Sequence, residues 1–264
     1  MKRHRPAVCT EGREEMRNAD CGTRNGGHGK QKSKVENRSA PVPSIVKSKA
    51  HSAIRNPHSG FSAVIFDLLS ALLNSWKLWN EIAGSDEIGL RWRKRYIQLT
   101  YAAGRYRPYE GIIGEAATAE GIPEDRAARL IQSWTKLEPW PETAQVLERL
   151  RRQVMLAVVT NCSEALAGVA VAKTRIHFTE VVTAERAGFY KPHPQAYRLA
   201  LEELKVEAAR ALFVAGSPAD LPGATSVGMP VFWHNRLRLP LLDSSVHPKF
   251  VSDSLWPLTE VVGG

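Results

Sequence analysis

The chain has 264 residues, 43% of them apolar, and a formal net charge of +9. This length allows a substantial core, and no apolar run is long enough to span a membrane or to form the core of a secretory signal. Residues 1–58 hold 13 Lys and Arg against 5 Asp and Glu, whereas residues 59–264 hold 23 against 22. We therefore predict a nearly neutral folded body preceded by a basic segment.

The basic segment, residues 1–58, is rich in Gly, Ser, Asn, Lys and Arg, and its few apolar residues have no period. Such a composition predicts disorder. The charge leaves open an attraction to nucleic acid, although we favour a solvated leader or a misassigned start. Cys9, Cys21 and Cys162 have no spacing typical of zinc or disulfide frameworks, which fits a reducing cytoplasm.

The first predicted strand is apolar around Val64 to Phe66 and ends at Asp67. Ligands of open parallel sheets bind beyond the carboxyl ends of the strands, so Asp67 either caps the next helix or takes part in chemistry. Later strand ends and loops carry Thr160, Lys191 and Asp220. We therefore predict that these polar groups share one site with Asp67.

Residues 74–138 contain only helical patterns, which predict a small helical cap inserted after the first strand. The predicted helices cover residues 72–83, 88–103, 112–119 and 124–137. The predicted domains are a disordered tail at 1–58, an α/β core at 59–73 and 139–264, and the cap at 74–138.

After residue 139, strands and helices alternate. The predicted strands are 154–159, 180–183, 211–215 and 230–234, separated by helices at 142–152, 164–173 and 195–204. A final helix is expected within 254–262. This alternation predicts an α/β fold whose parallel sheet is covered by helices on both faces.

Asp67 is expected to be ionised at neutral pH, since an unperturbed aspartic acid titrates near about 4. A carboxylate is a competent nucleophile when an electrophile is held in line with it. Thr160 and Asn161 precede a predicted helix, where a hydroxyl and free amides can hold an anion, although Thr160 can also serve as a helix cap.

Lys191 lies between Tyr190 and Pro192 in a loop that proline stiffens, so its side chain can be aimed at Asp67. Asp220 follows the next strand and can hold Lys191 through a charged hydrogen bond. Its alternatives are a metal ligand and a helix cap.

Over residues 61–262 this arrangement resembles the haloacid dehalogenase superfamily of aspartate-nucleophile hydrolases, with its Rossmannoid fold. Within that group it is most similar to the 2-haloacid dehalogenases. The matching features are the Trp92-Arg93 pair, Lys191 followed by Tyr197, and the aromatic segment 232–236 that ends in Asn-Arg.

The resemblance implies a role for each matching residue. Asp67 would be the nucleophile, and Arg93 would receive the halide or the substrate carboxylate. Thr160, Asn161, Tyr197 and Ser217 would form the substrate-binding group, with Tyr197 also helping Lys191 and Asp220 to balance charge.

The chain also departs from the family pattern. The usual Asp-x-x-Gly-Thr reads here as Asp67-Leu-Leu-Ser70-Ala71, and Leu69 stands where dehalogenases carry tyrosine. The family's Ser-Ser-Asn is replaced by residues 215–217, Ala-Gly-Ser. These departures predict that a hydroxyl that helps to hold Asp67, and an amide that helps to place water, are absent.

Three functions remain open. Hydrolytic dehalogenation needs no cofactor or metal and acts on a small anionic substrate. A Mg²⁺-dependent phosphatase is the alternative, since Asp67 and Asp220 can ligate Mg²⁺, but Leu69 cannot supply the proton that a leaving alkoxide needs. The third is a degenerate, non-catalytic binding protein. We expect a cytoplasmic protein that is not bound to membranes, and the sequence leaves open a homodimer.

Overall fold

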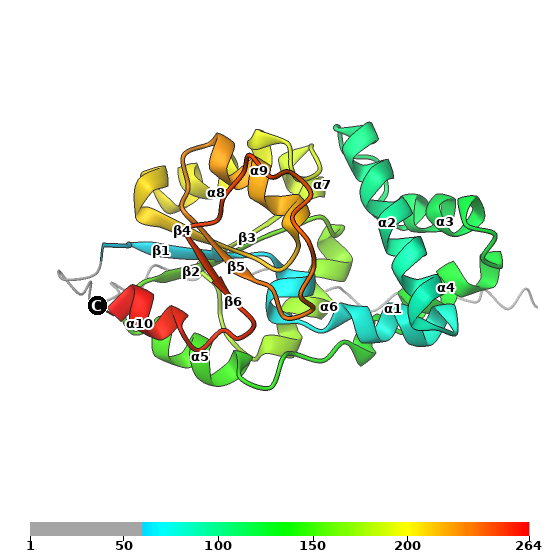
Figure 1. Ribbon diagram of the computed structural model, residues 1–264, viewed down its shortest axis with the longest axis horizontal. Helices are drawn as coiled ribbons and strands as arrows, with labels where there is room; N and C mark the ends of the chain where they lie inside the picture. The colour runs from blue at the N-terminus through cyan, green and yellow to red at the C-terminus, as the bar shows by residue number, and fades with distance from the viewer. Residues whose placement is uncertain (1–59, 264) are drawn as a thin grey trace, which may run out of the picture. The chain divides into compact units, whose positions relative to one another are not determined.

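The computed structural model describes residues 60–263 (Figure 1). The predicted tail at 1–58, with its proposed attraction to nucleic acid, lies outside the described residues. Among the residues described, no helix is both long enough and apolar enough to cross a membrane.

Across residues 60–263, six strands form one sheet in the order β3-β2-β1-β4-β5-β6, and every pairing is parallel. The strands are β1 (Ala63–Phe66), β2 (Met155–Thr160), β3 (Glu180–Thr183), β4 (Ala211–Ala215), β5 (Val231–His234) and β6 (Phe250–Ser252). The parallel sheet is therefore confirmed. The edge strand β6 was not predicted, because three residues give too short a pattern to recognise.

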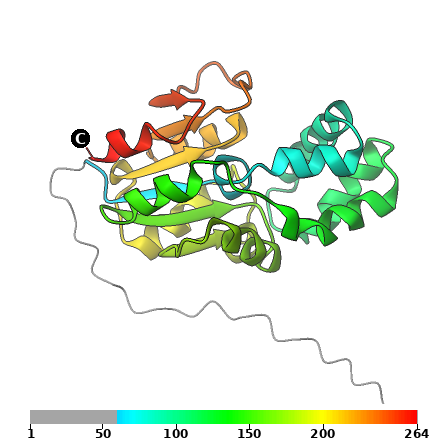
Figure 2. The ribbon, with the colours of Figure 1, turned by 90° about the horizontal axis from the view of Figure 1, so that it is seen from below.

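Helices cover both faces of the sheet (Figures 1 and 2). The strand β1 is buried on both sides: Val64 and Phe66 belong to one apolar cluster, and Ala63 and Ile65 to the other. The first cluster includes residues of α5 (Thr143–Leu150), α6 (Glu164–Thr174) and α10 (Leu258–Gly263). The second includes residues of α8 (Pro194–Leu204) and α9 (Leu221–Ser226). Three short helical turns also belong to this α/β part of the chain: α7 (Ala184–Ala187), η3 (Ala208–Arg210) and η4 (Pro218–Asp220).

Between η1 (Leu68–Leu72) and α5 the chain is helical, as predicted. The helices are α1 (Ser75–Ala83), α2 (Asp86–Ala103), α3 (Tyr109–Ala119), α4 (Glu124–Gln132) and the short η2 (Trp134–Lys136). Their interior is aromatic: Trp79 lies 4.9 Å from Trp92 and 5.5 Å from Tyr96 between ring centroids, and Tyr96 lies 5.7 Å from Tyr109. The assignment of residues 74–138 as a separate cap domain stays a prediction.

A π-helical turn, η1 (Leu68–Leu72), follows β1 directly, where the sequence predicted only the start of a longer helix. Side chains of the core hold its carbonyl groups. The Trp140 indole N–H donates to the Ser70 oxygen at 3.0 Å, and the Thr143 hydroxyl donates to the Leu72 oxygen at 2.9 Å. His234 Nδ1 lies 2.9 Å from the Ala71 oxygen and must donate, since a carbonyl only accepts. The turn is therefore fixed by residues far from it in sequence.

The loop after β4 lies directly against this turn. A Cβ atom added to Gly216 would lie 2.2 Å from both the Ser70 carbonyl carbon and the Ala71 nitrogen, closer than non-bonded atoms can approach. Gly216 therefore permits an approach of two backbone segments that no other residue allows.

We expect Gly216→Ala to lower the free energy of unfolding by about 1–3 kcal/mol, because the new methyl group must displace the η1 turn. The matched control is Gly168→Ala in α6, where a Cβ meets nothing within 4 Å. That change should be neutral or stabilising by up to about 1 kcal/mol. Urea unfolding of both variants measures the difference, and equal stabilities would contradict the close approach.

Candidate active site

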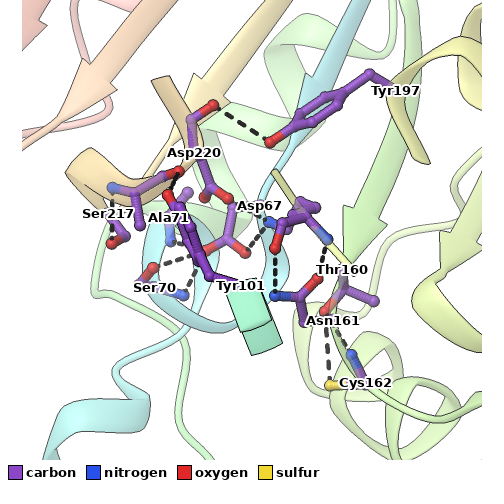
Figure 3. A network of polar contacts seen from close by, with 12 residues as sticks. Asp67, Ser70, Ala71, Tyr101, Thr160, Asn161, Cys162, Tyr197, Ser217 and Asp220 are labelled. Carbon is purple, nitrogen blue, oxygen red and sulfur yellow. Dashed lines mark hydrogen bonds and ion pairs between the residues drawn. The ribbon is translucent and has the colours of Figure 1, made fainter. Parts of the chain in front are cut away.

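Asp67 stands between β1 and η1 with only 6% of its surface exposed. Its Oδ2 atom accepts three hydrogen bonds: from the Ser70 N–H at 2.8 Å, the Ser70 hydroxyl at 2.7 Å and the Ala71 N–H at 3.2 Å (Figure 3). The expectation that a hydroxyl beside Asp67 would be missing is therefore wrong. The family pattern carries it on the residue after the glycine, whereas here Ser70 supplies it from the glycine position.

Lys191 joins two carboxylates. Its Nζ atom lies 2.8 Å from Asp67 Oδ1 and 3.0 Å from Asp220 Oδ1, and 3% of the lysine is exposed. Asn161 fixes the lysine backbone, because its Oδ1 accepts from the Lys191 N–H at 2.7 Å and its Nδ2 donates to the Lys191 oxygen at 3.4 Å. The structure thus brings together residues from three separate strand ends.

Asp67, Lys191 and Asp220 shift one another's pKa values. Burial alone would raise the pKa of Asp67, but the charge of Lys191 and the hydrogen bonds from Lys191 and Ser70 outweigh it, so this pKa lies below its usual value. Burial also raises the pKa of Asp220 to about 6; Lys191 opposes this rise, and the negative charge of Asp67 adds to it. Although burial disfavours the charged amine, Asp220 and Asp67 raise the pKa of Lys191. Asp67 and Lys191 are therefore ionised at neutral pH, and Asp220 is the group that titrates nearest to it.

Arg93 reaches the same site from α2. It is 6% exposed, and its guanidinium carbon lies 3.9 Å from the ring centroid of Trp76. One Nη donates to the Ser75 hydroxyl at 2.8 Å, whereas the buried Nε has no hydrogen-bond partner among the described residues. Burial lowers the pKa of Arg93, but a guanidinium stays protonated in proteins. Arg93 is therefore a buried cation with donor capacity left for an anion.

A cavity of about 50 Å³ lies between α2 and the strand ends, roughly the space of four water molecules. It is lined by Asp67, Leu69, Ser70, Arg93, Tyr96, Ile97, Thr100, Tyr101, Thr160, Asn161, Lys191, Ser217, Ala219 and Asp220. The Tyr101 hydroxyl donates to the Ala219 oxygen at 2.6 Å, which links α2 to the loop that carries Asp220 (Figure 3).

All but one of the predicted site residues line this cavity. The exception is Tyr197, a fully buried residue of α8 whose hydroxyl donates to the Asp220 backbone oxygen at 3.2 Å. Its ring packs 5.1 Å from that of Phe213 between centroids, so the structure places Tyr197 against Asp220 and outside the cavity lining, and its part in substrate binding stays a prediction.

The sequence left open that Thr160, Asp220 and Asp67 are helix caps, and the structure shows which residues do cap the helices. Ser163, not Thr160, caps α6, and the Thr160 hydroxyl lies 3.5 Å from the Cys162 sulfur. Ser217 caps η4 through the Ala219 N–H, and no cap hydrogen bond from Asp220 precedes α9. Asp67 caps η1 and also meets Lys191, and its part in the chemistry stays a prediction.

Ser70, Tyr96 and Tyr101 also line the cavity, but they were not among the site residues predicted from the sequence. The two tyrosines lie three and eight residues after Arg93 in α2, a spacing that places all three on one helical face. That periodicity was a usable signal. Ser70 had none, since its role depends on a π-turn that no pattern predicted.

A family model described as haloacid dehalogenase-like hydrolase matches residues 61–228. The chain belongs to this family of hydrolases. Haloacetate dehalogenase H-2 of Moraxella sp. (strain B) is 30% identical over 186 residues, which cover 61% of this chain and 83% of that protein. Phosphoserine phosphatase of Thermus thermophilus is 28% identical over 173 residues, covering 60% and 68%. A solved L-2-haloacid dehalogenase is 28% identical with a TM-score of 0.69, over 77% of this chain and 99% of that one.

Replacing Lys191 by Met should leave Asp67 and Asp220 buried without their cation, and should cost about 3–5 kcal/mol of unfolding free energy at about pH 8. The loss should shrink at about pH 5.5. Without the cation both carboxylates have raised pKa values in the folded state, so the folded state binds more protons than the unfolded state and gains stability as the pH falls.

Urea unfolding at the two pH values measures this difference. Lys94→Met, at an exposed lysine of α2, is the matched control and should change stability little at either pH. A loss for Lys191→Met that is independent of pH would contradict the charge-pairing account.

Proposed function

We propose that this hydrolase cleaves the carbon–halogen bond of a small 2-haloacid, with Asp67 as the nucleophile. The observation that supports it best is one small cavity that holds a buried, ionised carboxylate, its lysine partner, and a buried arginine with an unpartnered donor. This set matches the needs of the reaction: a nucleophile, a site for an anion, and no proton donor, since a halide leaves without a proton.

In the first step Asp67 Oδ1 attacks the carbon that bears the halogen. Oδ2 accepts from three donors, whereas Oδ1 accepts only from Lys191 among residues 60–263, so Oδ1 keeps a lone pair for the attack. A carbon–oxygen bond forms, the carbon–halogen bond breaks, and the halide leaves with the electron pair. Arg93, with Thr160 and Ser217, receives the halide or the substrate carboxylate.

In the second step water attacks the ester carbonyl carbon of Asp67, and Asp220 accepts its proton. The product hydroxyl keeps the former Oδ1, and Asp67 regains an oxygen from water. Asp220 suits this role because its pKa of about 6 lies close to neutral pH. The small cavity favours the smallest haloacids, and the Tyr197 hydroxyl supports Asp220 through its backbone oxygen.

Phosphatase activity is the second candidate, because a phosphoserine phosphatase is among the relatives. The residues do not fit the Mg²⁺ ion that this reaction would need. Lys191 Nζ bridges Asp67 and Asp220, Oδ2 of Asp67 already accepts from three donors, and Leu69 offers no side-chain oxygen, so few carboxylate ligands remain for an octahedral shell. We therefore derive no step through a metal.

Incubating the purified chain with chloroacetate, each enantiomer of 2-chloropropionate, and phosphoserine, with and without EDTA, tests the proposal. We expect halide release that survives EDTA and no phosphate release. Phosphate release that EDTA abolishes, without halide release, would overturn the proposal in favour of the phosphatase.

Asp67→Asn should lower halide release by about 10³-fold or more, because the nearly isosteric amide cannot attack carbon. Asp125→Asn, at an exposed position in the first turn of α4, is the control and should keep full activity. Full turnover by Asp67→Asn would exclude it as the nucleophile.

The steady-state rate should fall as the pH drops below the pKa of Asp220, because its protonated carboxyl cannot accept the proton of water, whereas Asp67 stays ionised for the first step because its own pKa lies lower. The midpoint should lie below the pKa of about 6 that Asp220 has beside the ionised Asp67, because ester formation removes the negative charge that adds to this rise. Halide release measured across the acid range checks this. A flat profile between about pH 4 and 7 would remove Asp220 from the role of base.

A further inference from the structure

The Oδ2 side of Asp67 is arranged for the second half of the reaction rather than the first. We propose that the Ser70 hydroxyl is a catalytic donor that stabilises the oxyanion formed when the Asp67 ester is hydrolysed. This inference rests on the proposed function and assigns a role to a residue that departs from the family pattern.

Oδ2 of Asp67 changes its bonding during the reaction. After Oδ1 has bonded to the substrate carbon, Oδ2 is the carbonyl oxygen of an ester. When water attacks the carbonyl carbon, an oxygen–carbon bond forms and the π electron pair moves onto Oδ2. The Ser70 hydroxyl and the N–H groups of Ser70 and Ala71 already lie 2.7, 2.8 and 3.2 Å from this atom. Donors placed where charge develops stabilise such a transition state.

The remaining atoms and protons of this step are also accounted for. Water gives one proton to Asp220, and collapse of the tetrahedral species breaks the bond between the carbonyl carbon and Oδ1. The departing alkoxide takes the proton from Asp220 and leaves as the hydroxy acid. Asp67 then loses a proton to solvent and is again a carboxylate, held by the same three donors.

The donors are held rigidly. Trp140 donates to the Ser70 oxygen, which belongs to the same peptide group as the Ala71 N–H, so the indole fixes the direction of that donor. His234 holds the next carbonyl, that of Ala71. Gly216 packs against this same peptide group, and Ser70 itself is 5% exposed. Little reorganisation is needed when charge appears on Oδ2.

Two departures from the family pattern lie side by side. The pattern has glycine after Asp-x-x and serine in the middle of Ser-Ser-Asn, whereas this chain has Ser70 and Gly216 at those two positions. A Cβ on Gly216 would lie 2.2 Å from the carbonyl carbon of Ser70. Glycine at 216 therefore lets the β4 loop lie against the backbone of the turn that carries the Ser70 hydroxyl.

Rapid-quench measurement of halide release from 2-chloropropionate separates the two steps, and intact-protein mass spectrometry detects the ester. For Ser70→Ala we expect a first-turnover burst of halide close to that of the wild type, a steady-state rate lower by about 100-fold, and accumulation of the covalent ester. Ser70→Gly removes the same hydroxyl and should behave alike. Thr174→Val, which removes a buried hydroxyl that donates to the Val171 oxygen in α6, is the control and should show neither change.

A Ser70→Ala enzyme that turns over at the wild-type rate would overturn the inference, and so would an equal slowing of burst and steady state without accumulated ester. Neither outcome would contradict the proposal that Asp67 is the nucleophile. Absence of halide release by the wild-type enzyme would instead overturn the proposed function, and this inference with it.

Discussion

The site depends on keeping a charged carboxylate buried at the end of β1. Removing Asp67 from water is costly, and the cost is offset only because both oxygens have charged or polar donors within hydrogen-bond distance. Lys191 would itself be unfavourable there without Asp67 and Asp220. Together with Arg93 the ionised groups carry no net charge, so each one is tolerated because of the others. A haloacid anion would then enter a site that is neutral overall but contains an arginine with an unspent donor.

The backbone around Asp67 is arranged for the same purpose. The η1 turn directs two amides and a hydroxyl at one oxygen of the Asp67 carboxylate. That turn is held from outside by Trp140, Thr143 and His234. Contacts with the core therefore stabilise a conformation of the η1 turn that its own sequence would not hold.

The other half of the site comes from α2. Arg93 and Tyr96 are buried in the helical segment, and Tyr101 contacts the loop beside Asp220. Asp67, the nucleophile that we propose, follows a strand of the sheet, and Arg93, the anion-binding residue that we propose, comes from a separate helix. Changes in α2 can alter which substrates fit the small cavity without disturbing the charges around Asp67.

The sequence by itself determined the alternation of strands and helices, the helical segment after the first strand, and the meeting of Asp67, Lys191 and Asp220. Those conclusions follow from hydrophobic periodicity and from the rule that parallel strands place their carboxyl ends at one edge. Only the tertiary structure decided that Ser70 restores a hydroxyl to Asp67, that Tyr197 lies behind Asp220 rather than in the cavity, and that β6 extends the sheet. Periodicity shows which face of an element is buried, but it cannot show which distant backbone comes close. Gly216 is an example, because its lack of a side chain matters only where its loop lies against the backbone of the η1 turn.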